Sequence, residues 1–134
     1  MPIVGVGTDV VDVHRIARLV DRDGHRFLSR WFRPTEVGPP SPVRVPARHI
    51  AALLAAKEAT FKSLRVSGSG PVPWHDIEII HHPGHGGATV RLHASMHELA
   101  AAAGIAGFHV SMSHTSDYAT ASVLAVTGEG HDSV

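Results

Sequence analysis

One long helical segment in the middle of the chain constrains the fold more than any other feature of the sequence. It runs from Pro46 or Ala47 to about Arg65, and its apolar residues recur with helical spacing at Ile50, Leu53, Leu54, Phe61 and Leu64. A helix with an apolar stripe of this kind must bury the stripe against another layer of structure. The shorter segments on both sides therefore have to supply that layer.

Those shorter segments predict five strands and three further helices. The strands are predicted over 3–7, 76–81, 88–94, 108–113 and 118–126, and the helices over 13–22, 25–32 and 95–103. Asp12 is placed to cap the first helix, Ser95 and Glu98 have the spacing of a capping box, and Gly104 ends the last helix. The proline-rich stretch from Pro34 is predicted to be a stiff loop. Short connections between the strands predict an α+β fold, with the long helix packed on a mainly antiparallel sheet.

Length and composition narrow the class of protein. The chain has 134 residues, enough for one domain, which we place at 1–126 with a flexible tail at 127–134. Twelve basic residues balance twelve acidic ones, so neither nucleic-acid binding nor disorder is expected. The chain has no cysteine, which excludes disulfides and thiolate chemistry. Neither a membrane span nor a secretory signal is predicted, so a cytoplasmic location is expected.

Asp9 and the segment AAKEATFK raise the question of function. Asp9 interrupts an apolar run just after two glycines, and a buried carboxylate needs a partner. Glu58 and Lys62 lie one helical turn apart at the margin of the apolar stripe, and Lys57 falls inside it. Two carboxylates can hold Mg²⁺ together with substrate phosphates, and a lysine beside them can neutralise phosphate charge.

A purely structural interpretation of the same residues stays open. Glu58 and Lys62 can form an ordinary surface pair, and Asp9 can cap the neighbouring helix. The stem of Lys57 can lie on the core while its ammonium reaches water. Twelve histidines also allow a histidine-rich metal-binding protein, although their spacing matches no ligand pattern.

A basic stripe on the first helix predicts an acidic partner. Arg15, Arg18 and Arg22 project from one side of this helix, and Arg26 and Arg30 follow in the next segment. An ordinary solvated face or a phosphate site would give the same pattern. On a chain without net charge, however, a local basic excess favours one particular acidic partner.

The combination of GVGTDVVDVHRI with AAKEATFK resembles the holo-acyl-carrier-protein synthase family, the small trimeric 4′-phosphopantetheinyl transferases. WHDIEI and HVSMSHTSDYATASVLAV extend the resemblance over most of the chain. It implies transfer of the phosphopantetheine arm of coenzyme A to a serine of an acyl carrier protein of fatty acid or polyketide synthesis. It also implies Mg²⁺, a homotrimer with shared sites, and an acidic carrier protein docked on the basic stripe.

The resemblance further implies roles for individual residues. Asp9 and Glu58 correspond to magnesium ligands, and Lys62 to a contact with the pyrophosphate of coenzyme A. Ser67, Gly68 and Gly70 could cradle phosphate, and the catalytic His114 would contact the nucleotide end together with Thr115. Because Thr115 replaces an aspartate of some relatives, the general base stays open between Glu58 and a metal-bound water.

Two departures from the family pattern keep a second function open. Leu53 stands where an arginine is usual, so a phosphate contact is lost unless Arg48 or Arg44 replaces it. Arg65 stands where the glycine loop usually begins. The chain is therefore expected to be either an active transferase or a relative that binds a carrier protein or coenzyme A without transfer.

Overall fold

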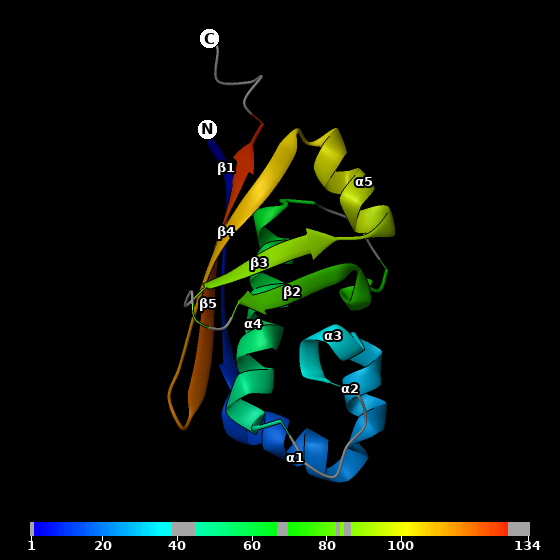
Figure 1. The fold of residues 1–134 in the computed structure, drawn as a ribbon, viewed down its shortest axis with the longest axis vertical. Helices are drawn as coiled ribbons and strands as arrows, with labels where there is room; N and C mark the ends of the chain where they lie inside the picture. The colour runs from blue at the N-terminus through cyan, green and yellow to red at the C-terminus, as the bar shows by residue number, and fades with distance from the viewer. Residues whose placement is uncertain (1, 39–44, 67–69, 83, 85–86, 129–134) are drawn as a thin grey trace.

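The computed structural model describes residues 2–38, 45–66, 70–82, 84 and 87–128. Its elements follow one another in the predicted α+β order (Figure 1). The strands are β1 (Ile3–Asp12), β2 (Ile77–His82), β3 (Gly87–Leu92), β4 (Ile105–His114) and β5 (Tyr118–Thr127). The helices are α1 (Val13–Asp23), α2 (His25–Trp31), α3 (Pro34–Val37), α4 (Ala47–Ser63) and α5 (Ala94–Ala102), with the 3-10 turn η1 at Trp74–Asp76.

The five strands form one antiparallel sheet, as the sequence predicts, and their order in it is β1-β5-β4-β3-β2. The long strands β1, β5 and β4 pair along most of their length, with Asp9 opposite Ala121 and Ala121 opposite Met112. The β2–β3 hairpin joins β4 through the pair Ala88 and Val110. The prediction that the first strand spans 3–7 is therefore wrong at its end: β1 continues to Asp12, and Asp9 lies within this edge strand rather than after it.

Helix α4 packs across one face of this sheet, mainly on β1 and β5 (Figure 1). Its apolar stripe is buried at Ile50, Leu53, Leu54 and Leu64 and half-buried at Phe61. Two glycines of β1 allow the contact: a Cβ on Gly5 would lie 1.8 Å from the Ser63 carbonyl oxygen, and one on Gly7 would lie 1.8 Å from that of Ala59. The backbones of β1 and α4 thus touch directly, which brings Asp9 beside the C-terminal half of α4.

Helices α1, α2 and α3 lie together beside the N-terminal half of α4, and α5 lies near the opposite end of the molecule (Figure 1). Val13, Ile16 and Val20 of α1 are buried. Asp12 caps α1 by accepting hydrogen bonds from the backbone N–H groups of His14 and Arg15. Asp9 is therefore not a helix cap, and the alternative that assigned it this role is wrong.

Three further local predictions are wrong for identifiable reasons. Pro34 does not break the structure but begins α3, because proline suits the first position of a helix. No capping box begins α5: its N-cap is His93, whose backbone and ring are held by Asp76 and Glu78. Thr127 belongs to β5 and is buried, so the boundary at 126 falls within a strand. The rest of the predicted tail, from residue 129, lies outside the described residues.

In the described ranges, the helices are too short or too polar to span a membrane.

Candidate active site

Asp9 and Lys62, which are 53 positions apart in the sequence, meet where β1 crosses α4. Lys62 Nζ donates to Asp9 Oδ1 at 3.1 Å and to the carbonyl oxygen of Thr8 at 3.0 Å. The Asp9 side chain is 11% exposed and that of Lys62 is 56% exposed. The carboxylate is thus sheltered, while the ammonium stays within reach of solvent and of a ligand.

Glu58 lies against the same carboxylate and completes an acidic pair. Burial, hydrogen bonding to Asp9 and the charge of Asp9 raise the pKa of Glu58 to about 7, although Lys62 and Arg15 oppose the shift. Asp9 Oδ2 is buried and finds no hydrogen-bond partner among the described residues. The acidic pair therefore keeps one buried carboxylate oxygen, Asp9 Oδ2, that no described side chain satisfies.

This donor set fits a small divalent cation with oxygen ligands. Mg²⁺ is commonly held by one or two carboxylates, with waters and substrate phosphates completing its shell. The described residues contain no cluster of three or more His, Asp or Glu side chains suited to a metal. Within them, the histidine-rich metal-binding hypothesis therefore finds no support, and a cation at Asp9 and Glu58 would need ligands from water or substrate.

His114, Thr115 and Arg48 come together at a different place. They line a cavity with Val13, Ala47 and Ser116, at the end of β4 and the start of α4. Arg48 and Glu58 are ten positions apart on α4, which corresponds to about 15 Å along the helix. A single chain therefore does not bring the predicted nucleotide contacts next to the acidic pair.

A second cavity beside His114 contains Leu53. It also receives the imidazoles of His49 and His81, whose rings lie edge to face at 6.1 Å. Burial and the neighbouring cationic groups lower the pKa of His49. Leu53 thus forms an apolar part of the wall of this cavity, and Arg48 lines the neighbouring cavity rather than this one.

The predicted phosphate cradle is described only in part. Gly70 has a φ of +112° and is exposed, whereas Ser67, Gly68 and the alternative Arg44 lie outside the described residues.

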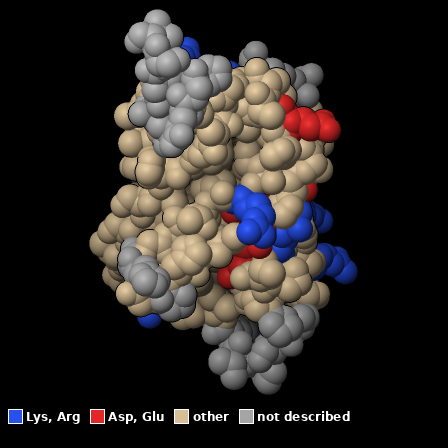
Figure 2. Space-filling view, turned by 45° about the horizontal axis from the view of Figure 1, so that its top comes forward, with Lys and Arg blue, Asp and Glu red and all other residues tan. Residues whose placement is uncertain are grey.

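Four of the predicted basic residues line a groove that also contains Glu58, which we call the arginine groove. Its rim carries Arg15, Arg22, Arg26 and Arg30, whereas Arg18 is exposed but does not line it. Apolar side chains form its floor, namely Ile16, Leu19, Phe27, Trp31 and Leu54. Figure 2 shows one face of the molecule, on which basic side chains gather beside acidic ones. Helical spacing placed Arg15 and Arg22 on one side of the first helix together with Arg18, which does not line the groove. The apolar lining joins three segments and has no local signal in the sequence.

Lys57 does not extend to water. Its side chain is 0% exposed, and Nζ donates to Glu36 Oε1 at 2.9 Å, to the Trp74 carbonyl oxygen at 2.9 Å and to that of Ile77 at 2.6 Å. These three acceptors match the three protons of a charged ammonium. Burial lowers the pKa of Lys57, and the charge of Glu36 opposes that shift. The alternative in which the Lys57 ammonium reaches water is therefore wrong, because α3 and η1 cover it.

The family of the chain follows from its sequence as well as from this geometry. Residues 5–122 match the family model described as the 4′-phosphopantetheinyl transferase superfamily. The chain therefore belongs to this superfamily, and the resemblance inferred from its motifs is confirmed.

Within the superfamily the chain is similar to holo-[acyl-carrier-protein] synthases. It is 44% identical over 124 residues to that of Desulforudis audaxviator (strain MP104C), which covers 92% of this chain and 93% of the relative. A crystal structure from Neisseria meningitidis has a TM-score of 0.80 at 30% identity, covering 94% of this chain and 100% of that one. The crystal structure of the Helicobacter pylori synthase in complex with coenzyme A has a TM-score of 0.75 at 28% identity, covering 90% of this chain and 99% of that one.

Proposed function

We propose that this chain is a holo-[acyl-carrier-protein] synthase, which transfers the 4′-phosphopantetheine arm of coenzyme A to a serine of an apo acyl carrier protein. The observation that carries the proposal is that Asp9, Glu58 and Lys62 converge, in a chain whose relatives with this activity align over nearly its whole length. The serine oxygen forms a bond to the β-phosphorus of coenzyme A. The bond from that phosphorus to the bridging oxygen breaks, and adenosine 3′,5′-bisphosphate leaves.

Asp9 and Glu58 would hold Mg²⁺, which, when bound, offsets the negative charge on the pyrophosphate oxygens. The Lys62 ammonium can exchange its contact with Asp9 for one with a non-bridging oxygen of the pyrophosphate, since its side chain is more than half exposed. The serine proton passes to a Glu58 oxygen, because Thr115 carries no carboxylate to receive it. Rigid packing of β1 on α4 keeps the two acids together, so the groups that stabilise the transition state are preorganised.

His114, Thr115 and Arg48 contact the nucleotide end of coenzyme A in this proposal, and they do so from a neighbouring copy of the chain. The distance along α4 between them and Glu58 supports a shared site. The uncovered outer side of the sheet supports assembly: Val6 and Val10 of β1 are 58% and 63% exposed, and Tyr118 is 55% exposed. A homotrimer would bury these apolar side chains and complete each site.

The arginine groove docks the carrier protein. Four arginines in its lining favour an acidic partner, its apolar residues offer area for burial, and Glu58 lines the same groove. A helix with acidic residues along an apolar face fits such a groove and would bring its serine to the acidic pair.

Leu53 favours a second candidate function, binding of a carrier protein or coenzyme A without transfer. Leu53 is 1% exposed and apolar, so it contributes no charge to the cavity beside His114. Mass measurement separates the two functions. After incubation with coenzyme A, Mg²⁺ and apo acyl carrier protein, we expect the carrier to gain the mass of one phosphopantetheine arm. No gain with several carriers, despite measurable coenzyme A binding, would support the second function.

A further inference from the structure

The α2 wall of the arginine groove has little stability of its own. Helix α2 has seven residues, and its N-cap is Gly24, which has no side chain that could cap the helix. Phe27 is its buried residue, while Arg26 and Arg30 are exposed. Isolated helices of this length are not stable in water, so tertiary contacts must decide where α2 lies. The placement of Arg26 and Arg30 therefore depends on whatever holds α2.

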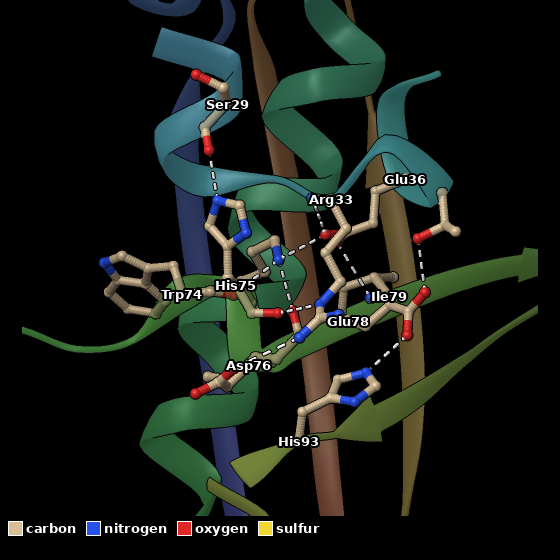
Figure 3. A network of polar contacts seen from close by, with 12 residues as sticks. Ser29, Arg33, Glu36, Trp74, His75, Asp76, Glu78, Ile79 and His93 are labelled. Carbon is tan, nitrogen blue, oxygen red and sulfur yellow. Dashed lines mark hydrogen bonds and ion pairs between the residues drawn. The ribbon is translucent and has the colours of Figure 1, made fainter. Parts of the chain in front are cut away.

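The turn η1 holds α2 through one aromatic contact and one hydrogen bond. The indole of Trp74 stacks on that of Trp31 with ring centroids 5.0 Å apart and an interplanar angle of 20°. The His75 ring Nε2 contacts the carbonyl oxygen of Ser29 in the last turns of α2 (Figure 3). Because a carbonyl oxygen only accepts, the imidazole nitrogen that faces Ser29 carries the proton.

The same turn is fixed to the core on its other side. Arg33 Nε donates to the His75 carbonyl oxygen at 2.5 Å, and Lys57 Nζ donates to the Trp74 carbonyl oxygen at 2.9 Å (Figure 3). Lys57 is the residue before Glu58 on α4. The turn η1 therefore connects the acidic pair's own helix to the basic wall of the groove.

We propose that His75 is a positioning residue for carrier binding, which holds α2 so that Arg26 and Arg30 face the carrier in the arginine groove. This inference rests on the proposed function, because it takes the groove as the carrier's docking surface. His75 is only partly buried and lies outside the packed core, so its replacement should loosen α2 without unfolding the protein.

The test compares His75→Leu with His75→Gln, using coenzyme A, Mg²⁺ and an apo acyl carrier protein as substrates. Leucine keeps bulk but loses the donor, whereas glutamine places an N–H at a similar reach. Loss of one hydrogen bond predicts a rise of about three- to tenfold in the KM for the carrier. The KM for coenzyme A and kcat should stay within about twofold in both variants. His97→Leu, at an exposed position of α5, is the matched control.

A second readout follows α2 directly. Trp31 and Trp74 are the two tryptophans of the chain, so near-ultraviolet circular dichroism reports their stacking. We expect His75→Leu to reduce this signal and His75→Gln to keep it. A merely structural role would instead lower kcat through loss of folded protein and leave the KM for the carrier unchanged.

The double variant Arg26→Glu with Arg30→Glu distinguishes failure of the positioning role of His75 from failure of the docking proposal. If this double variant raises the KM for the carrier and His75→Leu does not, the positioning role is overturned while the docking groove stands. If neither variant changes that KM although transfer proceeds, the carrier docks elsewhere, and both the docking proposal and the positioning role fail.

Discussion

At the scale of single residues, the chemistry depends on two acids that meet across β1 and α4. Glu58 is half-buried beside Asp9, and one Asp9 oxygen has no hydrogen-bond partner in the part of the chain that the structure describes. Such a pair costs free energy unless a proton or a cation joins it. Hydrophobic residues in these two places would avoid the cost. We infer that the acidic pair is present despite it because the pair binds a divalent cation.

Glu58→Gln should abolish transfer and leave the fold intact. The amide keeps the shape of the side chain but removes its charge, so we expect kcat/KM to fall by more than about 100-fold. Transfer is measured as mass gained by the carrier, and folding by circular dichroism. Glu98→Gln on the exposed surface of α5 is the control and should be fully active. Near-normal turnover of Glu58→Gln would rule out Glu58 as a metal ligand and as a proton acceptor.

The same pair predicts a pH dependence of stability. The pKa of Glu58 is about 7 in the folded chain against an ordinary 4.5, so folding favours its protonated form. This stabilisation is complete below about pH 4.5 and is lost as pH rises through about 7. The metal-free protein should thus melt at a lower temperature at pH 8 than at pH 6. Glu58→Gln should flatten this dependence, and Mg²⁺ should raise the melting temperature at pH 8. An unchanged pH dependence in the variant would contradict the assigned pKa.

At the scale of elements, the position of the acids depends on how closely β1 approaches α4. Gly5 and Gly7 leave no room for a side chain against the carbonyl oxygens of Ser63 and Ala59. The sequence predicted the long helix and the presence of five strands, because these depend on periodicity and local chemistry, but it ended the first strand at Gly7 instead of Asp12. It did not predict that Lys62 pairs with Asp9 rather than Glu58, or that Lys57 is covered by α3, because both depend on contacts between distant segments.

Gly7→Ala tests the contact between β1 and α4. A methyl group 1.8 Å from the Ala59 carbonyl oxygen must push the two elements apart, which should cost about 3 kcal/mol or more of unfolding free energy. Gly107→Ala is the control, since its nearest neighbour would be a Val126 methyl group at 3.8 Å. Urea denaturation measures both. Equal midpoints for the two variants would show that β1 tolerates displacement from α4.

Arg15→Glu with Arg22→Glu tests the arginine groove. Reversal of two rim charges should weaken carrier binding by about tenfold or more and coenzyme A binding much less. Surface plasmon resonance with the carrier and calorimetry with coenzyme A measure the two affinities. Arg91→Glu on β3 lies outside the groove and should bind the carrier normally. Equal losses for both ligands would assign the rim to coenzyme A instead.

At the scale of the whole molecule, the exposed apolar side of β1 predicts assembly. Val6→Glu with Val10→Glu should convert the proposed trimer to a monomer, because both side chains are more than half exposed in the single chain. Analytical ultracentrifugation should give about three times the chain mass of 14.2 kDa for the unmodified protein. Leu99→Glu on α5 should not change the assembly. A monomeric, fully active unmodified protein would refute the shared site.

Cation binding by the acidic pair is tested most directly by titrating the protein with Mn²⁺ and following free Mn²⁺ by electron paramagnetic resonance. Because Mn²⁺ shares the oxygen preference of Mg²⁺, we expect one site per chain, tighter with coenzyme A present, and its loss in Asp9→Asn and Glu58→Gln. Unchanged Mn²⁺ binding in both variants would contradict the claim that these two residues hold the metal.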